Sequence, residues 1–321
     1  MKMVRALFVF AVFLAPCAWA APAQPPAVDD EKSGPVFSTE VIASSDAELK
    51  GTNASEYRHV SFYHASWALA QTIPVRPTST LTFGLNYSVS GRRVTEPPKW
   101  ADDKWADFKA THPDWDRVPI PTRLQALSAN VEYATEVNGR WTLSTNVGAG
   151  SYVATKGLLS KGCGFSTSVM GLYKWSPTLD IAVGVAFDSL SHDYRLVPLI
   201  GFDWQLNDKW SLAIGFPSTA LTYSLTKRLT LGIEASGSGG TFYVQDDPAP
   251  GIAPRSLAES KLETIEVRLG FKAAWKINDT FSISGTSGHV LYREFKYIDR
   301  GYKLKSHNLA SFIALGGTIS F

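Results

Sequence analysis

The chain has 321 residues, of which 45% are hydrophobic, 12% aromatic and 19% charged, and its mean hydropathy is −0.05. Outside the N-terminus, no apolar run approaches the ~18 residues of a membrane-spanning helix, which excludes a helical membrane protein. A formal charge of +2 provides no basic face, so nucleic acid is not expected as a partner. The apolar and aromatic content is too rich for a disordered chain.

The N-terminus has the pattern of a secretory signal peptide. Lys2 and Arg5 precede a short apolar stretch, and Ala18-Trp19-Ala20 is a small-x-small cleavage signal. We therefore expect residues 1–20 to be a signal peptide that is cleaved during export. Its loss removes two of the 31 basic residues, which leaves 29 to balance the 29 acidic residues. Residues 21–36, rich in Ala, Pro and Asp, are expected to form a flexible linker.

From residue 37 onward, apolar and polar residues alternate in one segment after another. Leu81, Phe83 and Leu85, for example, alternate with Thr and Gly, and this period of two predicts β-strands. We expect about fourteen strands, with twelve as the alternative, because 210–216 and 219–225 are short for a membrane crossing. The expected strands cover 37–47, 57–73, 79–90, 122–136, 140–153, 164–175, 179–187, 195–206, 210–216, 219–225, 228–244, 260–277, 280–293 and 307–321.

The connections between these strands alternate between short turns and long loops. This asymmetry is typical of a transmembrane β-barrel with short periplasmic turns and long extracellular loops. We therefore expect residues 37–321 to form an all-β, up-and-down, antiparallel transmembrane β-barrel. The long loops are expected near 48–56, 91–121, 154–163, 188–194, 245–259 and 294–306.

The strand positions opposite the apolar set carry mostly small or polar residues, with scattered charges. Such a set makes a poor soluble core, whereas in a membrane barrel it faces a polar lumen. A charge that faces hydrocarbon at mid-depth costs about 2–4 kcal/mol, so the lumen is the expected side for charges within strands. The candidates for lumen-facing charges are Glu132, Lys174, Asp180, Asp203, Glu234, Glu266, Arg268 and Lys272.

Aromatic residues recur near the predicted short turns. Trp and Tyr favour the boundary between lipid and water because their rings are apolar with a polar tip. We therefore expect an aromatic girdle on the periplasmic side, with ordinary packing at sheet ends as the alternative. The girdle candidates are Tyr133, Trp141, Trp175, Trp204, Trp210, Trp275 and Phe281.

Apolar residues alternate along the last predicted strand up to a C-terminal Phe. This ending resembles the last strand of Gram-negative outer-membrane barrels, which the assembly machinery reads. The resemblance implies export to the outer membrane of a Gram-negative bacterium, with outer-membrane lipid and the assembly machinery as partners. We expect a monomer. The candidates for the assembly signal are Ile313, Leu315, Ile319 and Phe321.

A second resemblance lies in the 36 residues from Gly201 to Ser236. It is carried by Trp204, Asn207-Asp208, Trp210, Phe216-Pro217 and Leu221-Thr222-Tyr223. This segment resembles a family of uncharacterised bacterial outer-membrane barrels, which is known as a domain of unknown function. The resemblance implies the fold and the location, but neither an activity nor functional residues.

The sequence offers no catalytic constellation and no metal motif. His64 and His289 lie inside predicted strands that also carry Ser, but no recognisable motif surrounds them. Neither Cys-x-x-Cys nor His-Glu-x-x-His occurs, and no metal or other cofactor is expected. The glycine-rich segment 236–240 lacks a following Lys-Ser/Thr, so we read it as a bulge or a strand kink.

The loop over 91–121 is longer than loops in compact folds normally are, which favours a functional role. It either folds into the barrel mouth as a constriction, which we favour, or presents aromatic rings outward to a glycan or a partner surface. Its aromatic residues are Trp100, Trp105, Phe108 and Trp115.

Three functions therefore stay open. The leading one is passive: a narrow pore, with a small solute as its cargo, or a structural protein of the envelope. The second is an interaction or adhesion barrel that uses the aromatic loop. The third, which we weight least because the chain is not expected to be an enzyme, is a lipid-modifying enzyme that uses His64 or His289.

Overall fold

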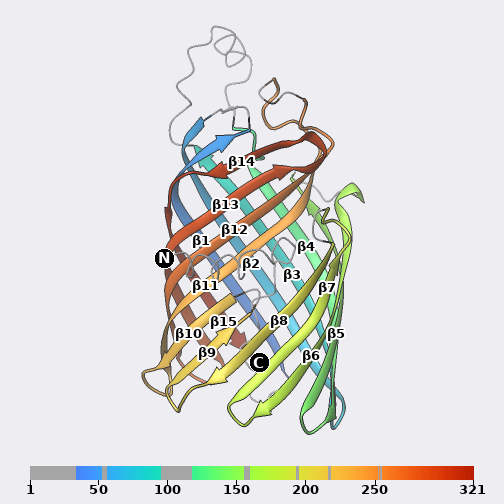
Figure 1. Ribbon diagram of the computed structural model, residues 1–321, viewed down its shortest axis with the longest axis vertical. Helices are drawn as coiled ribbons and strands as arrows, with labels where there is room; N and C mark the ends of the chain where they lie inside the picture. Colours follow the sequence, from blue (N-terminus) through green and yellow to red (C-terminus); the bar gives the residue numbers. More distant parts are fainter. Residues whose placement is uncertain are drawn as a thin grey trace.

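The computed structural model describes residues 34–52, 56–94, 118–154, 160–192, 195–215, 218–251, 253 and 255–321. In these ranges the chain forms one sheet of fifteen strands, closed into a barrel with long loops at one end and short turns at the other (Figure 1). We refer to the long-loop end and the short-turn end. The strands are β1 (Pro35–Gly51), β2 (Glu56–Arg76), β3 (Ser79–Val94), β4 (Arg123–Asn138), β5 (Trp141–Val153), β6 (Cys163–Ser176), β7 (Leu179–Asp188), β8 (Leu196–Gln205), β9 (Trp210–Ile214), β10 (Ser218–Ser224), β11 (Leu229–Val244), β12 (Ser260–Lys276), β13 (Phe281–Tyr297), β14 (Tyr302–Ser306) and β15 (Ala310–Ser320).

Consecutive strands pair antiparallel around the wall, in up-and-down order. β14 and β15 both lie between β13 and β1, so they are two pieces of one strand position. The described wall therefore has fourteen strand positions, which confirms the fourteen-strand, up-and-down antiparallel barrel that the alternating pattern predicts. Closure leaves no edge between the last strand and β1, where the ladder runs from Val36↔Ser320 to Ser44↔Phe312.

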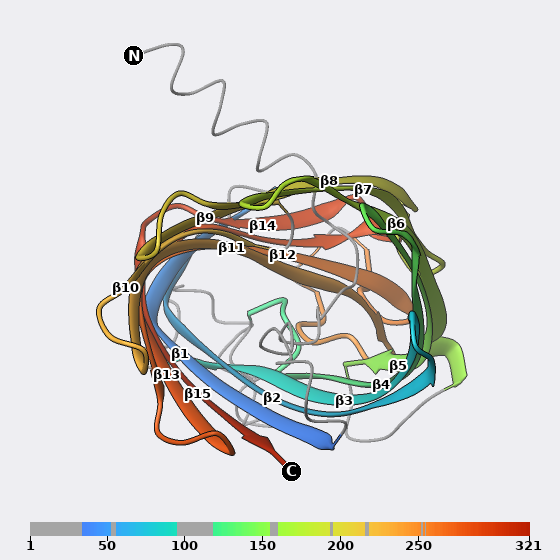
Figure 2. The ribbon, with the colours of Figure 1, turned by 90° about the horizontal axis from the view of Figure 1, so that it is seen from below.

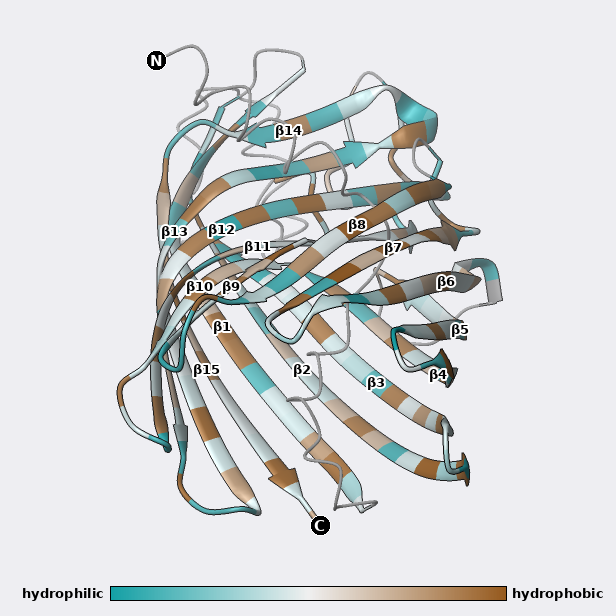
Figure 3. Cartoon of the chain, turned by 60° about the horizontal axis from the view of Figure 1, so that its bottom comes forward, coloured by the Kyte–Doolittle hydropathy of each residue, from teal (hydrophilic) through white to brown (hydrophobic). Residues whose placement is uncertain are grey.

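Most strands have one apolar, exposed side, whereas the other side faces the interior. Figure 3 shows this as bands of alternating hydropathy along the strands. Phe271 is 73% exposed, and Val131 and Tyr133, on either side of Glu132, are 40% exposed. A belt of exposed apolar side chains of this kind is stable against lipid, which is the environment that a transmembrane barrel requires.

Side-chain oxygens stabilise the turns at the short-turn end. Asn138 Oδ1 accepts from the backbone N–H groups of Arg140 and Trp141 at 2.9 and 3.0 Å. Asn207 and Asn278 accept in the same way from the residues two and three positions on. These local bonds satisfy backbone donors that the ladder cannot reach, which explains why Asn recurs at these turns.

The barrel interior near the long-loop end is filled by an apolar core. Leu49, Val60, Leu262 and Leu304 are fully buried there, and the hydroxyls of Tyr57 and Tyr302 lie 3.4 Å apart. The strand pattern suggested a polar interior along the whole barrel. Near the long-loop end, the interior is apolar instead. A bulge between Ser44 and Ala47 shifts the inward positions of β1, so that Ala47 and Leu49 point inside.

Several sequence expectations about local structure are wrong. The connection near 48–56 is not long, because β1 runs to Gly51 and β2 begins at Glu56. The segment 294–306 is not a long loop, because β13 runs to Tyr297 and β14 follows after the short 3₁₀ turn η2 (Ile298–Arg300). Of the two interpretations of the glycine-rich segment 236–240, the bulge is wrong, because β11 pairs with β12 there without a register shift, and the strand kink stays a prediction. β1 begins at Pro35, inside the expected linker, and residues 1–33 lie outside the described residues.

Candidate functional site: the lumen and the plug at its mouth

The predicted lumen charges sit at three depths of the barrel. Nearest the short turns, Asp180 is the register partner of both Lys174 and Asp203. Further in, Lys272 Nζ lies 2.7 Å from Glu234 Oε2. Glu132 makes no hydrogen bond or ion pair with the residues that the structure describes.

The deepest lumen charges form an ionic layer of Glu266, Arg268 and Arg293. Glu266 accepts from the Nε groups of both arginines, one to each carboxylate oxygen. Arg268 Nη2 also donates to Ser238 Oγ at 3.2 Å, and the guanidinium of Arg293 stacks over the Phe62 ring at 4.1 Å. The layer therefore carries one net positive charge and borders the apolar core, since Arg268 and Arg293 lie over the rings of Phe312 and Phe62. Sequence reasoning missed Arg293 because it is the last residue of an expected strand.

The two histidines of the enzyme hypothesis lie on opposite faces of the wall. His64 Nδ1 is 2.8 Å from Ser90 Oγ inside the barrel, and His289 Nδ1 is 3.5 Å from Ser311 Oγ on the exposed face. A hydrolase needs a third group that orients the histidine. Within the described ranges, no carboxylate or amide side chain is hydrogen-bonded to either ring.

A short segment at the end of the 91–121 loop lies inside the barrel mouth. Residues 118–121 are buried, with Val118 and Ile120 in the apolar core. Arg92, on β3, donates from Nε to the carbonyl of Ile120 at 2.7 Å and from Nη2 to that of Val118 at 3.0 Å. Tyr297, on β13, donates to the carbonyl of Pro119 at 2.9 Å. We call residues 118–121 the plug.

The plug and its anchors were not predicted as site residues. Arg92 lies in β3, which was expected to end at residue 90, and Tyr297 was expected in a loop. The aromatic residues of the same loop, Trp100, Trp105, Phe108 and Trp115, lie outside the described residues. Only the end of the loop can therefore be placed, and it is folded inward.

The remaining candidates lie on the outer face. Among the girdle candidates, Trp175 and Trp275 are strongly exposed near short turns, Trp141 and Trp210 pack on Tyr173 and Tyr223, and Phe281 is half-buried. Of the assembly-signal candidates, Ile313, Leu315 and Phe321 are exposed and Ile319 is half-buried.

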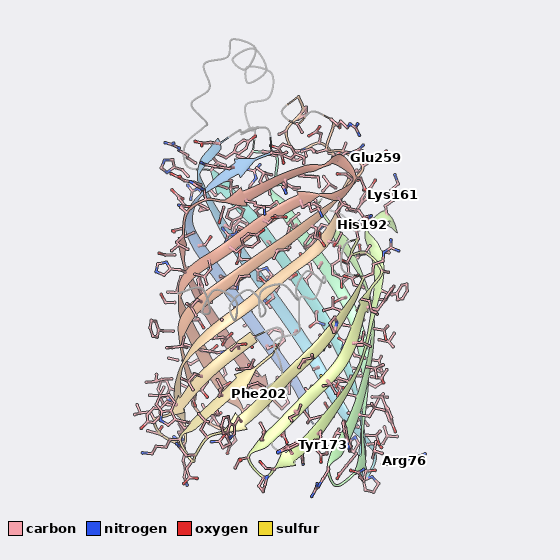
Figure 4. All side chains as sticks on the ribbon, viewed as in Figure 1. Arg76, Lys161, Tyr173, His192, Phe202 and Glu259 are labelled. Carbon is pink, nitrogen blue, oxygen red and sulfur yellow. The ribbon has the colours of Figure 1, made fainter. Side chains whose placement is uncertain are left out.

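An exposed ion pair connects two loops at the long-loop end. Lys161 Nζ, in the 3₁₀ turn η1 (Ser160–Gly162), lies 3.0 Å from Glu259 Oε1, and Figure 4 shows the two side by side, far from Arg76 and Tyr173. The hydrogen bond from Lys161 lowers the pKa of the Glu259 carboxyl and raises the pKa of the Lys161 ammonium. This pair bridges the segment before β6 to the segment before β12.

Two other kinds of feature are absent from the described part of the chain. No group of three or more His, Cys, Asp or Glu side chains there could hold a metal ion. None of its helices is long and apolar enough to cross a membrane.

A family model described as "Domain of unknown function (DUF6268)" matches residues 98–308, which is 211 of the 321 residues. The chain belongs to this family. The DUF6268 match includes the segment 201–236, on which the sequence resemblance was based, and β4 to β14 of the barrel. No curated protein sequence matches the chain.

Among solved structures, this DUF6268 chain is similar to several barrels. One is a deletion mutant of the TodX monoaromatic hydrocarbon channel, with 10% identity, a TM-score of 0.49, and coverage of 90% of this chain and 91% of the other. A second is an outer-membrane channel from Pseudomonas putida F1, with 12% identity, a TM-score of 0.45, and coverage of 92% of this chain and 100% of the other. A third is a FadL homologue from Pseudomonas aeruginosa, with 11% identity, a TM-score of 0.45, and coverage of 90% of each chain. At such low identity and TM-score, neither a substrate nor a mechanism follows for the DUF6268 chain.

Proposed function

We propose that the protein is a passive channel of the Gram-negative outer membrane that is kept shut at its extracellular mouth. The exposed apolar belt supports a membrane location, since a water-soluble protein rarely exposes so large an apolar surface. The charged and small interior positions near the short turns support a solute path, because such side chains hold water rather than pack into a core. The substrate is a small polar solute.

The plug carries this proposal. Three hydrogen bonds from two side chains, together with apolar packing of Val118 and Ile120, hold residues 118–121 in the mouth. Each hydrogen bond contributes about 1–2 kcal/mol, so the plug can leave the mouth without unfolding the wall. A barrel with a polar lumen near the short-turn end and a removable plug near the long-loop end has the parts of a gated pore.

Conductance in planar lipid bilayers tests the proposal. Arg92→Ala removes both bonds to the plug, so we expect larger and more frequent single-channel currents than in the wild-type protein. Arg92→Lys is the matched control, because it keeps a cation and a donor at the same place and is expected to behave more like the wild type. Heat-modifiable mobility on gels checks that each variant is folded.

Two results contradict the proposal. One is a wild-type protein that conducts as well as Arg92→Ala, because the mouth is then not shut by the plug. The other is an absence of current in both folded proteins across voltages and salts, because the lumen is then not a path for ions.

A further inference from the structure

Among the strands that the structure describes, the wall has one place where neighbouring edges are not hydrogen-bonded to each other. β9 pairs with β8 only as far as Ile214↔Phe202, and β10 pairs with β11 only as far as Ser218↔Ser236. Beyond these points, no described strand pairs with Leu196–Ile200 of β8 on the β9 side or with Gly237–Phe242 of β11 on the β10 side. We call these two edges the seam. Figure 1 shows β8 and β11 on either side of the short strands β9 and β10.

Backbone hydrogen bonds show which groups point into the seam. Two bonds connect β8 to β7: Asp188 N–H donates to Arg195 O, and Gln205 N–H donates to Thr178 O. Because peptide groups alternate in direction along a strand, the odd-numbered peptide groups of β8 point toward β7. The even-numbered positions, including Leu196 and Ile200, therefore face the seam, and Pro198 has no N–H to leave unpaired there. A proline on the free edge of a strand is a known protection against pairing with another strand.

A backbone hydrogen bond also shows which peptide groups of β11 face the seam. Leu225 N donates to Leu229 O, so the odd-numbered peptide groups of β11 face β10 and, beyond its end, the seam. Gly237 and Gly239 hold two of these positions and have no side chain to cover the edge. At these two positions β11 therefore presents backbone groups and no side chain of its own to the seam.

Toward the long-loop end, the wall overlaps itself and closes the seam. Thr241 and Glu263 are register partners on the outward face of β11 and β12, yet they are only 1% and 2% exposed. Ser191, which follows β7, lies 3.5 Å from Glu263 Oε1, and Figure 2 shows β11 and β12 inside the arc of β7 and β8. β11 also meets β5 there, at Tyr243↔Val153.

The seam lies at the level of the apolar belt. On β8, Leu196 and Ile200 are 67% and 66% exposed on the lipid-facing side. An unpaired peptide group in hydrocarbon costs several kcal/mol, so those of the seam need water. The lumen behind the wall is the source of that water, and the seam is therefore where lumen water comes closest to the lipid.

On the lumen side, a cation lies behind the bare edge of β11. Ser238, between Gly237 and Gly239, accepts a hydrogen bond from Arg268 Nη2. Arg268 and Arg293 share the single carboxylate of Glu266, which leaves one positive charge in the layer. An anionic group that enters from the seam meets this charge, while an attached acyl chain stays against Leu196 and Ile200.

We propose that the seam is a lateral binding portal for an anionic membrane lipid, which places its headgroup toward Arg268 and its acyl chains in the bilayer. The occupant is membrane lipid because the seam faces the bilayer, and it is anionic because the charge behind the seam is positive. The portal goes beyond the proposed channel: it depends on the polar lumen and the seam and not on conduction through the plug. A folded barrel that carries no current would contradict the proposed channel but not the portal.

Fluorescence quenching in vesicles tests the portal. In a Cys163→Ser background, a fluorophore is attached at Ser236→Cys, a lumen position on β11 beside the seam. The control is Asn146→Cys, a lumen position on β5 that has paired strands on both sides. Phosphatidylglycerol with a spin label on its acyl chain is expected to quench the first fluorophore and not the second, and spin-labelled phosphatidylcholine to quench neither.

Two substitutions check the recognition itself. Arg268→Gln is expected to abolish quenching by phosphatidylglycerol, and Arg268→Lys to retain it, with heat-modifiable mobility as the measure of folding. Gly237→Trp, which fills the seam, is expected to abolish quenching as well. Ile233→Trp, on the same face of β11 but between paired strands, is expected to have no effect.

The proposal is overturned by equal quenching at the two positions, by its absence at Ser236→Cys, or by equal quenching by the two phospholipids. Quenching by spin-labelled stearate but not by phosphatidylglycerol also overturns it, because the occupant is then a free acyl acid and not a membrane lipid.

Discussion

The ionic layer consists of charges that sequence alone could place in the lumen but could not pair. Glu266 and Arg268 are two residues apart in β12 and were predicted to face the interior, and Arg293 reaches them from β13. Pairing depends on the register of β12 against β13, which the alternating pattern does not specify. The register of β12 against β13 also shifts between Val267 and Arg268, and no residue there predicts this shift.

Removing Glu266 should strongly destabilise the barrel. Glu266→Gln leaves two largely buried arginines without a counter-charge, and breaking a buried pair in this way costs about 3–5 kcal/mol. Glu234→Gln is the matched substitution, and it should cost well under half as much because water reaches the Lys272 ammonium. The midpoint of urea unfolding in detergent, followed by tryptophan fluorescence, measures both, and equal midpoints would contradict the burial argument.

At the scale of elements, the strand pattern predicts most of the wall within a few residues. It fails at β14, where Lys303 and Lys305 alternate with Tyr302 and Leu304 beyond the apolar belt and therefore resemble a polar loop. It also fails at the plug, because residues 118–121 are buried by contacts with β3 and β13 that are distant in sequence. Contacts of this kind leave no periodic signal.

The link between η1 and the segment before β12 should depend on pH. Because the hydrogen bond from Lys161 lowers the pKa of the Glu259 carboxyl from its ordinary value of 4.5, the contribution of the pair is fully present above that value and is lost as the pH falls through the lowered pKa. The protection of Gly162 and Cys163 against hydrogen exchange, relative to the intrinsic rate at each pH, should therefore fall in acid. In Lys161→Met, this protection should be low at neutral pH and change little in acid, and the same acid response as in the wild type would contradict the assignment.

At the scale of the whole molecule, the interior has two zones, a polar lumen near the short turns and an apolar core with the plug near the long loops. The composition of the inward positions predicts the first zone. It could not predict the second, because a period of two separates the two faces of a strand without saying how far along the barrel each face stays polar. The inward-facing Leu262, for example, lies on the same face of β12 as Glu266 and Arg268.

Deleting residues 98–116 should open the mouth. The deletion removes most of the chain between β3 and the plug, so the plug segment is drawn toward β3 and cannot keep its place against Tyr297. We expect a larger single-channel conductance in planar bilayers than for the full chain. Unchanged current in a folded deletion variant would contradict the constriction reading of this loop.

Accessibility of the lumen from each side tests the closed channel most directly. In a Cys163→Ser background, Asn130→Cys places a thiol on the inward face of β4, beside Asn86. A thiol reagent that cannot cross membranes should label it quickly from the periplasmic side and not from outside intact cells, and adding Arg92→Ala should allow labelling from outside. Fast labelling from outside with Arg92 in place, or none from the periplasmic side, would contradict a polar lumen that is shut only at its mouth.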